Sequence, residues 1–253
     1  IRGAVLEETM NYKNFNFLIN KLKKSYFLHK QKELNYQTDL VSVVSSKLKE
    51  YVHKYYDIDH SRIFVNHSFA SEYFQYSKKA RSEYRKKLNI HKNEIVFIFS
   101  TGGNGAWQNT TEIVNTMRKS EFKIINLSKK EIPGKNVINL FVPHREVPNY
   151  LSAADIGIVW RNDDVVNNVA SPVKFSEYAS CGLPVIANNG VKLIETYIRD
   201  TGYGKILNSI EELHKVPFNE LQKINRMQIS EYSKSKFHIS GVAKGYLSMY
   251  ETL

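Results

Sequence analysis

Ile95-Val-Phe-Ile-Phe-Ser100 is the stretch of sequence that decides the fold. Its run of apolar residues leaves neither face of a strand polar, which is typical of a central parallel strand covered by helices on both sides. Short runs rich in β-branched and aromatic residues recur along the chain, separated by polar stretches of helix length. They lie at residues 41–44, 63–65, 122–127, 137–141, 156–160 and 184–187. This alternation predicts an α/β protein with a mostly parallel sheet.

The same pattern divides the chain into two expected parts. Residues 95–100 are predicted to form the first strand of a Rossmann-like C-terminal domain, which we place at 71–253. Residues 1–70 are expected to hold about two strands and a few helices, too little for an independent α/β domain. We therefore interpret residues 1–70 as the remnant of an N-terminal α/β domain whose front is absent.

Composition narrows the class of protein. The chain has 253 residues, a net charge of +11 and a single cysteine, Cys181, which excludes a disulfide framework and paired-cysteine zinc sites. No apolar run approaches the roughly 20 residues that span a bilayer, and no secretion signal is recognisable, so a cytoplasmic location is expected. The positive charge fits nucleic acid, anionic lipid or nucleotide phosphates.

A glycine-rich loop, Ser100-Thr-Gly-Gly-Asn-Gly-Ala-Trp107, follows the first strand of the expected C-terminal domain. Ligands collect beyond the carboxyl ends of parallel strands, and glycine lets backbone amides approach a phosphate closely. Gly103, Asn104 and Gly105 are therefore candidate phosphate contacts. The loop is not a dinucleotide fingerprint, because the third glycine is replaced by Gln108. A tight strand-to-helix turn without a ligand is the alternative.

A second candidate segment begins at Pro172, which can start a helix and leave free amides at residues 173–175. Lys174 and Glu177 lie three residues apart and share one helix face. The lysine and the amides suit a diphosphate, and the carboxylate suits the two hydroxyls of a ribose. An ordinary exposed ion pair is the alternative reading. Gly182 is predicted to end this helix before the buried strand at 184–187.

The residues of this segment resemble a known family. The pattern Pro172-x-Lys174-x-x-Glu177-Tyr-x-x-x-Gly182-x-Pro184 is similar to the donor-binding motif of retaining glycosyltransferases with the GT-B fold. The residues at 153–160 resemble the strand before that motif, those at 101–108 the glycine loop, and those at 2–8 and 39–45 segments late in the N-terminal domain. The matches occur in the family's order along nearly the whole chain.

The resemblance implies transfer of a sugar, with retention, from a nucleotide diphosphate sugar to a glycan or lipid-linked acceptor of bacterial capsule or lipopolysaccharide synthesis. It implies neither cofactor nor metal, and a last helix, at about 240–253, that crosses back to the N-terminal domain. The implied donor-binding residues are Gly103, Asn104, Gly105, His144, Ser171, Val173, Lys174 and Glu177. His144 enters because the loop at 140–148 lies beside the nucleotide base in this family. No residue is assigned the proton transfer.

Two departures from the family pattern concern the contacts to the sugar and to the diphosphate. The usual motif has a first glutamate eight residues before the one at Glu177, and here Val169 stands in its place. Asp163 or Asp164 could reach the same space from the preceding loop, and the alternative is that both are solvated loop acids. Residues 102–109 carry no cation for the diphosphate, which leaves that role to Lys174 and backbone amides.

Two other functions stay open from the sequence. The first is a basic module that binds membrane or nucleic acid without catalysis, through the cations of residues 78–88, namely Lys78, Lys79, Arg81, Arg85, Lys86 and Lys87. No nucleic-acid-binding signature accompanies these cations, so peripheral contact with the inner leaflet fits them better. The second is a nucleotide-sugar epimerase on the same fold. The donor base, the sugar and the acceptor are not specified by the sequence.

Overall fold

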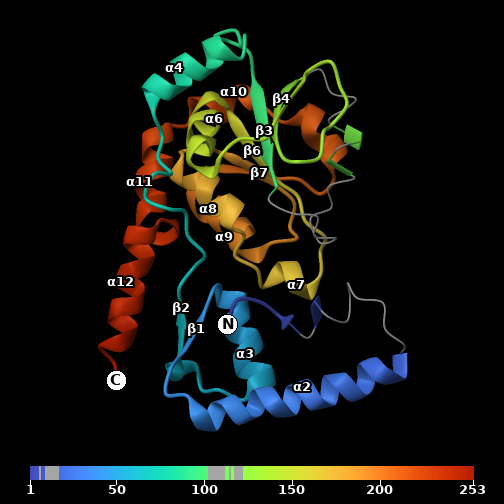
Figure 1. The fold of residues 1–253 in the computed structure, drawn as a ribbon, viewed down its shortest axis with the longest axis vertical. Helices are drawn as coiled ribbons and strands as arrows, with labels where there is room; N and C mark the ends of the chain where they lie inside the picture. The colour runs from blue at the N-terminus through green and yellow to red at the C-terminus, as the bar shows by residue number, and fades with distance from the viewer. Residues whose placement is uncertain (6, 9–16, 102–111, 114, 117–121) are drawn as a thin grey trace.

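The computed structural model describes residues 1–5, 7–8, 17–101, 112–113, 115–116 and 122–253. Its larger part is a six-stranded parallel sheet with the strand order β5-β4-β3-β6-β7-β8 (Figure 1). The strands are β3 (Val96–Ser100), β4 (Lys123–Leu127), β5 (Val137–Leu140), β6 (Ile156–Val159), β7 (Val185–Ala187) and β8 (Gly204–Ile206). The predicted α/β fold with a parallel sheet is confirmed.

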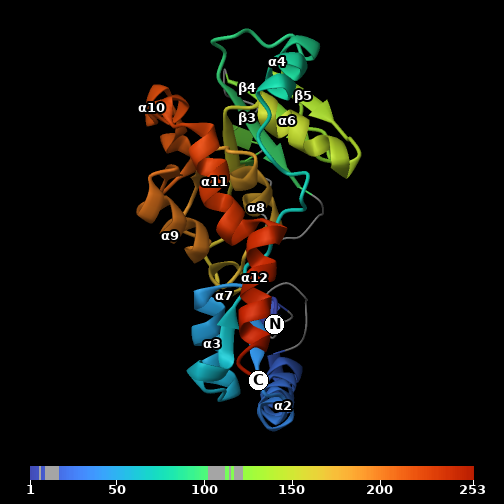
Figure 2. The ribbon, with the colours of Figure 1, turned by 90° about the vertical axis from the view of Figure 1, so that its left-hand side faces the viewer.

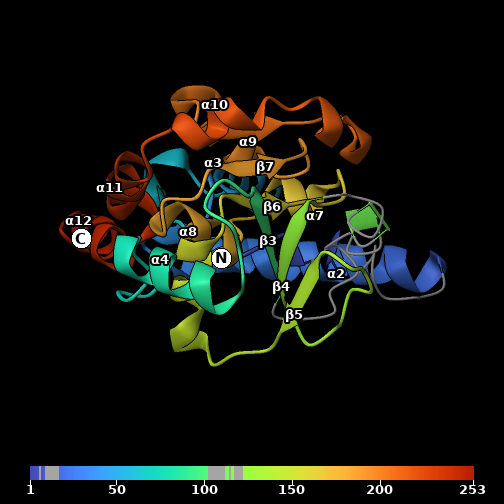
Figure 3. The same ribbon diagram turned by 90° about the horizontal axis from the view of Figure 1, so that it is seen from above.

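Both faces of this sheet are buried, as the apolar run at residues 95–100 predicts. Val96 and Ile98 point to one face, where they join a cluster with residues of α6 (Val147–Ala153), α8 (Val173–Ser180) and α9 (Lys192–Thr201). Phe97 and Phe99 point to the other face and pack with η4 (Ile210–Lys215) and α10 (Phe218–Lys223). Figure 3 shows α10 on one side of the strands and α8 on the other.

Strand β8 is absent from the sequence-based expectation. It contains only three residues, including Gly204 and the exposed Lys205, so it carries no apolar run. Its existence follows from pairing with β7 at the edge of the sheet, which a local pattern does not reveal.

The N-terminal part is a separate small layer. Strands β1 (Val41–Val43) and β2 (Ile63–Val65) form a two-stranded parallel sheet, joined by α3 (Ser46–Tyr56) and η1 (His60–Arg62). The longer helix α2 (Phe17–Gln37) precedes β1. A core cluster that includes Val43, Leu48 and Ile63 holds this part together. We refer to residues 1–65 as the N-terminal unit.

A crossing segment, residues 66–77, leads from β2 to α4 (Lys78–Lys87) at the start of the larger part. The chain returns at its end through α11 (Arg226–Phe237) and α12 (Ile239–Tyr250). Helix α12 descends beside the N-terminal unit (Figures 1 and 2). Gly245 of this helix lies directly against the Asn66 side chain, where a β-carbon would collide with the amide oxygen. The two parts are thus joined by two neighbouring passages of chain.

Alanine substitutions at two helix-ending glycines, Gly182 and Gly202, test how much the close contact between Gly182 and the Arg226 carbonyl contributes to stability. Gly182 and Gly202 have nearly equal φ angles of +69° and +71°, but only at Gly182 would a β-carbon collide with backbone, the carbonyl of Arg226. We expect Gly202→Ala to lower the free energy of unfolding by roughly 1 kcal/mol, the cost of the left-handed backbone alone. Gly182→Ala should lose roughly 3 kcal/mol because the collision adds to that cost. If urea unfolding gave equal losses of free energy for the two variants, the predicted collision at Gly182 would be contradicted.

Candidate functional site

The candidate site lies where the strand order reverses. The chain runs outward from β3 through β4 to β5, and then returns to the other side of β3 with β6. Ligands of open α/β sheets bind beyond the carboxyl ends of the strands at such a switch point. Helix α8 (Val173–Ser180) follows β6 there, after the short helix α7 (Val165–Asn168), which lies on the side of the sheet toward the N-terminal unit (Figure 1).

The start of α8 offers two backbone amides. Pro172 is the N-cap, and its carbonyl accepts the Phe175 amide at 3.0 Å and the Ser176 amide at 3.3 Å. The prediction of three free amides is therefore wrong for Phe175, because a tightened first turn satisfies it within the helix. The amides of Val173 and Lys174 have no acceptor among the residues that the structure describes. These two amides remain for an anion.

Glu177 is the buried acid of the site. Its side chain is 2% exposed, and its two oxygens have different partners: Oε2 lies 2.8 Å from Lys174 Nζ, and Oε1 lies 3.1 Å from His144 Nε2. The alternative of an ordinary surface ion pair is wrong, because a carboxylate at this depth needs partners to be tolerated. The fold thus brings together three of the predicted site residues, His144, Lys174 and Glu177.

Two tyrosines complete this arrangement, and the sequence analysis missed both roles. The Tyr73 hydroxyl, from the crossing segment, lies 2.6 Å from His144 Nδ1. The Tyr178 hydroxyl, on α8, accepts the backbone amide of Ser100 at 2.8 Å. Burial raises the pKa of Tyr178 well above its ordinary value, so this hydroxyl stays neutral. Tyr178 lies in the quoted motif, but no sequence signal links Tyr73 to it.

The residues just before α8 bind the crossing segment and the N-terminal unit. Ser171 Oγ accepts the Ser68 amide at 3.0 Å, so its hydroxyl joins two parts of the chain. Val169, at the position of the family's first glutamate, is 4% exposed and packs in the core of the N-terminal unit. Its carbonyl accepts the Ser45 hydroxyl at 2.6 Å. The side chain at position 169 therefore points into an apolar core, where it packs with residues of the N-terminal unit.

The two loop acids have local partners. Asp164 caps α7 by accepting the Asn167 amide at 2.9 Å, and Asp163 Oδ1 accepts the side-chain amide of Asn168 at 2.8 Å. These contacts favour the reading of the two acids as loop residues. The predicted phosphate contacts at Gly103, Asn104 and Gly105 lie outside the described residues.

The described parts of the chain contain neither a metal-binding cluster nor a membrane-spanning helix. No group of three or more His, Cys, Asp or Glu side chains there could hold a metal ion. None of the described helices is both long and apolar enough to cross a membrane.

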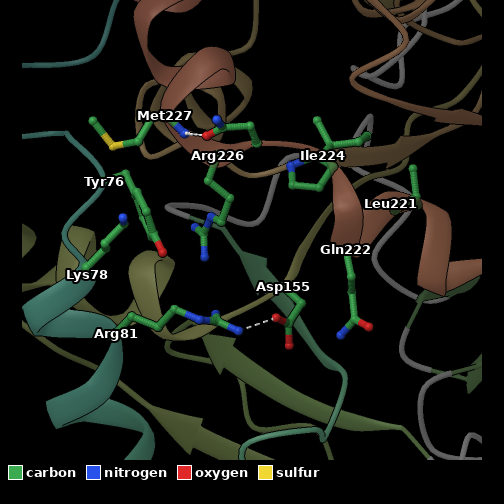
Figure 4. A pocket seen from close by; sticks show the side chains of 11 residues that line it. Tyr76, Lys78, Arg81, Asp155, Leu221, Gln222, Ile224, Arg226 and Met227 are labelled. Carbon is green, nitrogen blue, oxygen red and sulfur yellow. Dashed lines mark hydrogen bonds and ion pairs between the residues drawn. The ribbon is translucent and has the colours of Figure 1, made fainter.

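A cavity of about 260 Å³ lies at the opposite, amino-terminal edge of the sheet (Figure 4). Asp155, just before β6, lies at its floor and is bound by Arg81 at 2.6 Å and Arg85 at 3.1 Å. Asp155 Oδ2 also accepts the Val96 amide at 2.9 Å, at the start of β3. These contacts make Asp155 a brace between α4 and two central strands.

Arg226 forms the other wall of this cavity and stacks 4.2 Å from the centre of the Tyr76 ring. Its guanidinium donates to five carbonyls at the ends of α6 and α8, those of Leu151, Ser152, Ala154, Cys181 and Gly182. Burial, followed by the nearby Arg81, lowers the pKa of Arg226 to about 10. All five donors are occupied by protein, so Arg226 acts as a structural cap for two helices.

The cations of α4 therefore have two roles, since the two arginines bond inside the protein and the lysines remain at the surface. Arg81 and Arg85 turn inward to Asp155 and to carbonyls of residues 152–154. The cations left exposed are Lys78, Lys79, Lys86 and Lys87.

Solved structures resemble this fold at low sequence identity. A glycosyltransferase from Rickettsia africae matches 90% of the chain with a TM-score of 0.66 and 14% identity, and the chain covers 66% of it. WaaG, a glycosyltransferase involved in lipopolysaccharide biosynthesis, matches 80% with a TM-score of 0.63 and 15% identity, and 60% of it is covered. Anabaena Alr3699/HepE in complex with UDP-glucose matches 85% with a TM-score of 0.63 and 13% identity, and 64% of it is covered.

These likenesses define the architecture as that of the GT-B glycosyltransferases. The chain spans less than two thirds of the length of each of these three proteins. No curated protein sequence matches it.

The family follows from the sequence model of the glucosyltransferase 3-like C-terminal domain, which matches residues 101–247. This match covers more than half of the chain, and the chain belongs to that family.

The substitution Asp155→Asn tests whether Asp155, at the amino-terminal edge of the sheet, stabilises the fold. We expect a loss of roughly 3 to 5 kcal/mol in the free energy of unfolding, because the substitution leaves the buried Arg85 without its carboxylate. Asp200→Asn, which removes the exposed partner of Arg199, is the matched control and should cost less than about 0.5 kcal/mol. Urea unfolding measures both, and similar losses would contradict the bracing role of Asp155.

Proposed function

We propose that this protein transfers a sugar from a nucleotide diphosphate sugar to a hydroxyl of a glycan or lipid-linked acceptor, with retention and without a metal. The observation that carries the proposal is the buried Glu177 carboxylate between Lys174 and His144. Beside it, at the switch point of the sheet, lie two amides without an acceptor among the residues that the structure describes. Membership of the glucosyltransferase 3-like family supports the reaction class.

Glu177 is suited to a vicinal diol. A carboxylate has about four acceptor positions, two on each oxygen. In the structure Lys174 and His144 each occupy one of them. The two hydroxyls of a nucleotide ribose would donate to the remaining positions, as charge-assisted hydrogen bonds that anchor the nucleoside.

Lys174 is placed to change partners when a donor binds. Its side chain is 24% exposed, and its ammonium group bonds Glu177 Oε2, three residues further along the helix. A diphosphate at the start of α8 would draw the lysine away from Oε2, and a ribose hydroxyl would replace it there. The departing diphosphate would then be stabilised by Lys174, by the amides of Val173 and Lys174, and by the positive end of the helix dipole.

UDP-glucose is the first donor to test. The Anabaena protein was crystallised with UDP-glucose and with UDP, and the matched family model is named for a glucosyltransferase. A role in cell-envelope glycan synthesis is proposed on the likeness to WaaG. Thermal shifts with UDP, GDP, ADP and CMP would identify the base, because a ligand that binds only the folded state raises the melting temperature.

Glu177→Gln tests the proposed site with UDP. The amide keeps the size of the side chain but removes the charge that strengthens the diol bonds, so we expect UDP affinity to fall roughly 10- to 100-fold by calorimetry. Glu231→Gln is the matched control, since Glu231 pairs with Lys234 at the same spacing and at 2.8 Å but on the exposed face of α11. The control should bind UDP as the unmodified protein does. Unchanged affinity in the folded Glu177→Gln protein would refute the proposed site.

We also propose that the protein contacts the inner leaflet of the cytoplasmic membrane, where lipid-linked acceptors lie. The exposed lysines of α4 support this, since cations near an anionic surface contribute about 1 kcal/mol each. Lys78→Gln, Lys79→Gln, Lys86→Gln and Lys87→Gln together should reduce sedimentation with phosphatidylglycerol vesicles at least tenfold. Neutral phosphatidylcholine vesicles are the control. Equal sedimentation with both vesicle types would refute the contact.

A further inference from the structure

Tyr73 is held next to the candidate site by an anchored stretch of the crossing segment. Ser68 donates its amide to Ser171 Oγ at 3.0 Å and accepts the Ser176 hydroxyl at 2.6 Å. Ala70 then forms a bridge to His238, and Phe74 is 1% exposed. The backbone on both sides of Tyr73 is therefore fastened to the larger part of the protein.

His144 is clamped between Tyr73 and Glu177, although half of its side chain is exposed. Nδ1 lies 2.6 Å from the Tyr73 hydroxyl and Nε2 lies 3.1 Å from Glu177 Oε1. The Phe74 ring adds a tilted contact, with ring centres 5.1 Å apart. Both ring nitrogens and one face of the imidazole thus have partners from three different residues.

This geometry selects how the imidazole is protonated. A neutral imidazole has one donor and one acceptor nitrogen, and a carboxylate accepts only, so Nε2 must carry the proton toward Glu177. Nδ1 then accepts the Tyr73 hydroxyl proton. In the protonated form Nδ1 donates to the tyrosine oxygen instead. The Nε2 bond to Glu177 is kept in both forms.

We infer that Tyr73 and His144 are positioning residues that hold the Glu177 carboxylate for the donor's ribose while Lys174 turns to the diphosphate. This inference rests on the proposed function. Once Lys174 leaves Oε2, His144 is the remaining side chain among the described residues that bonds Glu177. Tyr73 acts through His144, since its hydroxyl fixes a ring that is otherwise half in solvent. The segment that joins the two parts of the chain thereby contributes to the donor site.

Tyr73→Phe is the first test. We expect UDP affinity to fall about three- to tenfold by calorimetry, the usual value of one uncharged hydrogen bond. Tyr232→Phe is the matched control, because its hydroxyl also forms an exposed hydrogen bond with a side chain, that of Lys236 at 2.8 Å, and lies on α11 away from α8 residue Glu177 and its partners. That variant should bind UDP unchanged. Urea unfolding of both variants verifies that they are folded.

A double-mutant cycle separates positioning from a general loss of structure. If Tyr73 acts through Glu177, adding Tyr73→Phe to Glu177→Gln should weaken UDP binding by less than about twofold further. His144→Gln retains a side-chain amide that can donate to Glu177, so it should bind UDP more tightly than His144→Ala. Tyr73→Phe should have no effect in the His144→Gln protein, where the tyrosine has lost its partner.

The outcomes distinguish the two proposals. Unchanged UDP binding by Glu177→Gln refutes the proposed site and with it the positioning pair. Weakened binding by Glu177→Gln together with unchanged binding by Tyr73→Phe overturns the positioning pair alone. Losses for Tyr73→Phe and Glu177→Gln that add in full also overturn it, because the tyrosine would then act by another route.

Discussion

Helix α8 is buried at six consecutive residues, from Phe175 to Ser180, and three of its polar side chains, those of Ser176, Glu177 and Tyr178, find hydrogen-bond partners inside the protein. Each partner comes from a different part of the chain. Ser176 bonds the crossing segment, Glu177 bonds the loop after β5, and Tyr178 bonds the end of β3. The need to satisfy buried polar groups on one short helix thus joins the crossing segment, the sheet and the candidate donor site.

The two edges of the sheet use charge in different ways. At the amino-terminal edge, Arg226 donates all of its hydrogen bonds to backbone carbonyls at helix ends. Asp155 accepts the Val96 amide and pairs with Arg81, so it connects a strand to α4. At the carboxyl edge, Glu177 has acceptor positions to spare, and two amides of α8 lack an acceptor among the described residues. This contrast, more than the presence of a cavity, is the reason for proposing the donor site at the carboxyl edge.

Prediction from sequence succeeded where the signal is local. The apolar runs located the strands, the spacing of Lys174 and Glu177 placed both on one helix face, and Gly182 ended that helix with a positive φ. It failed where the cause is distant in sequence. Strand β8 exists through pairing with β7, and the amide of Phe175 is satisfied by a turn that the motif does not reveal.

The sequence by itself determined the α/β class, the buried parallel strands and the helix that carries Lys174 and Glu177, because periodicity and capping act over a few residues. Only the tertiary structure decided the burial of Glu177, the approach of His144 and Tyr73, and the packing of Val169 into the N-terminal unit. Those features arise from contacts between segments 33 to 124 residues apart. No local pattern encodes such contacts, since they depend on the order of strands in the sheet and on how the crossing segment returns to it.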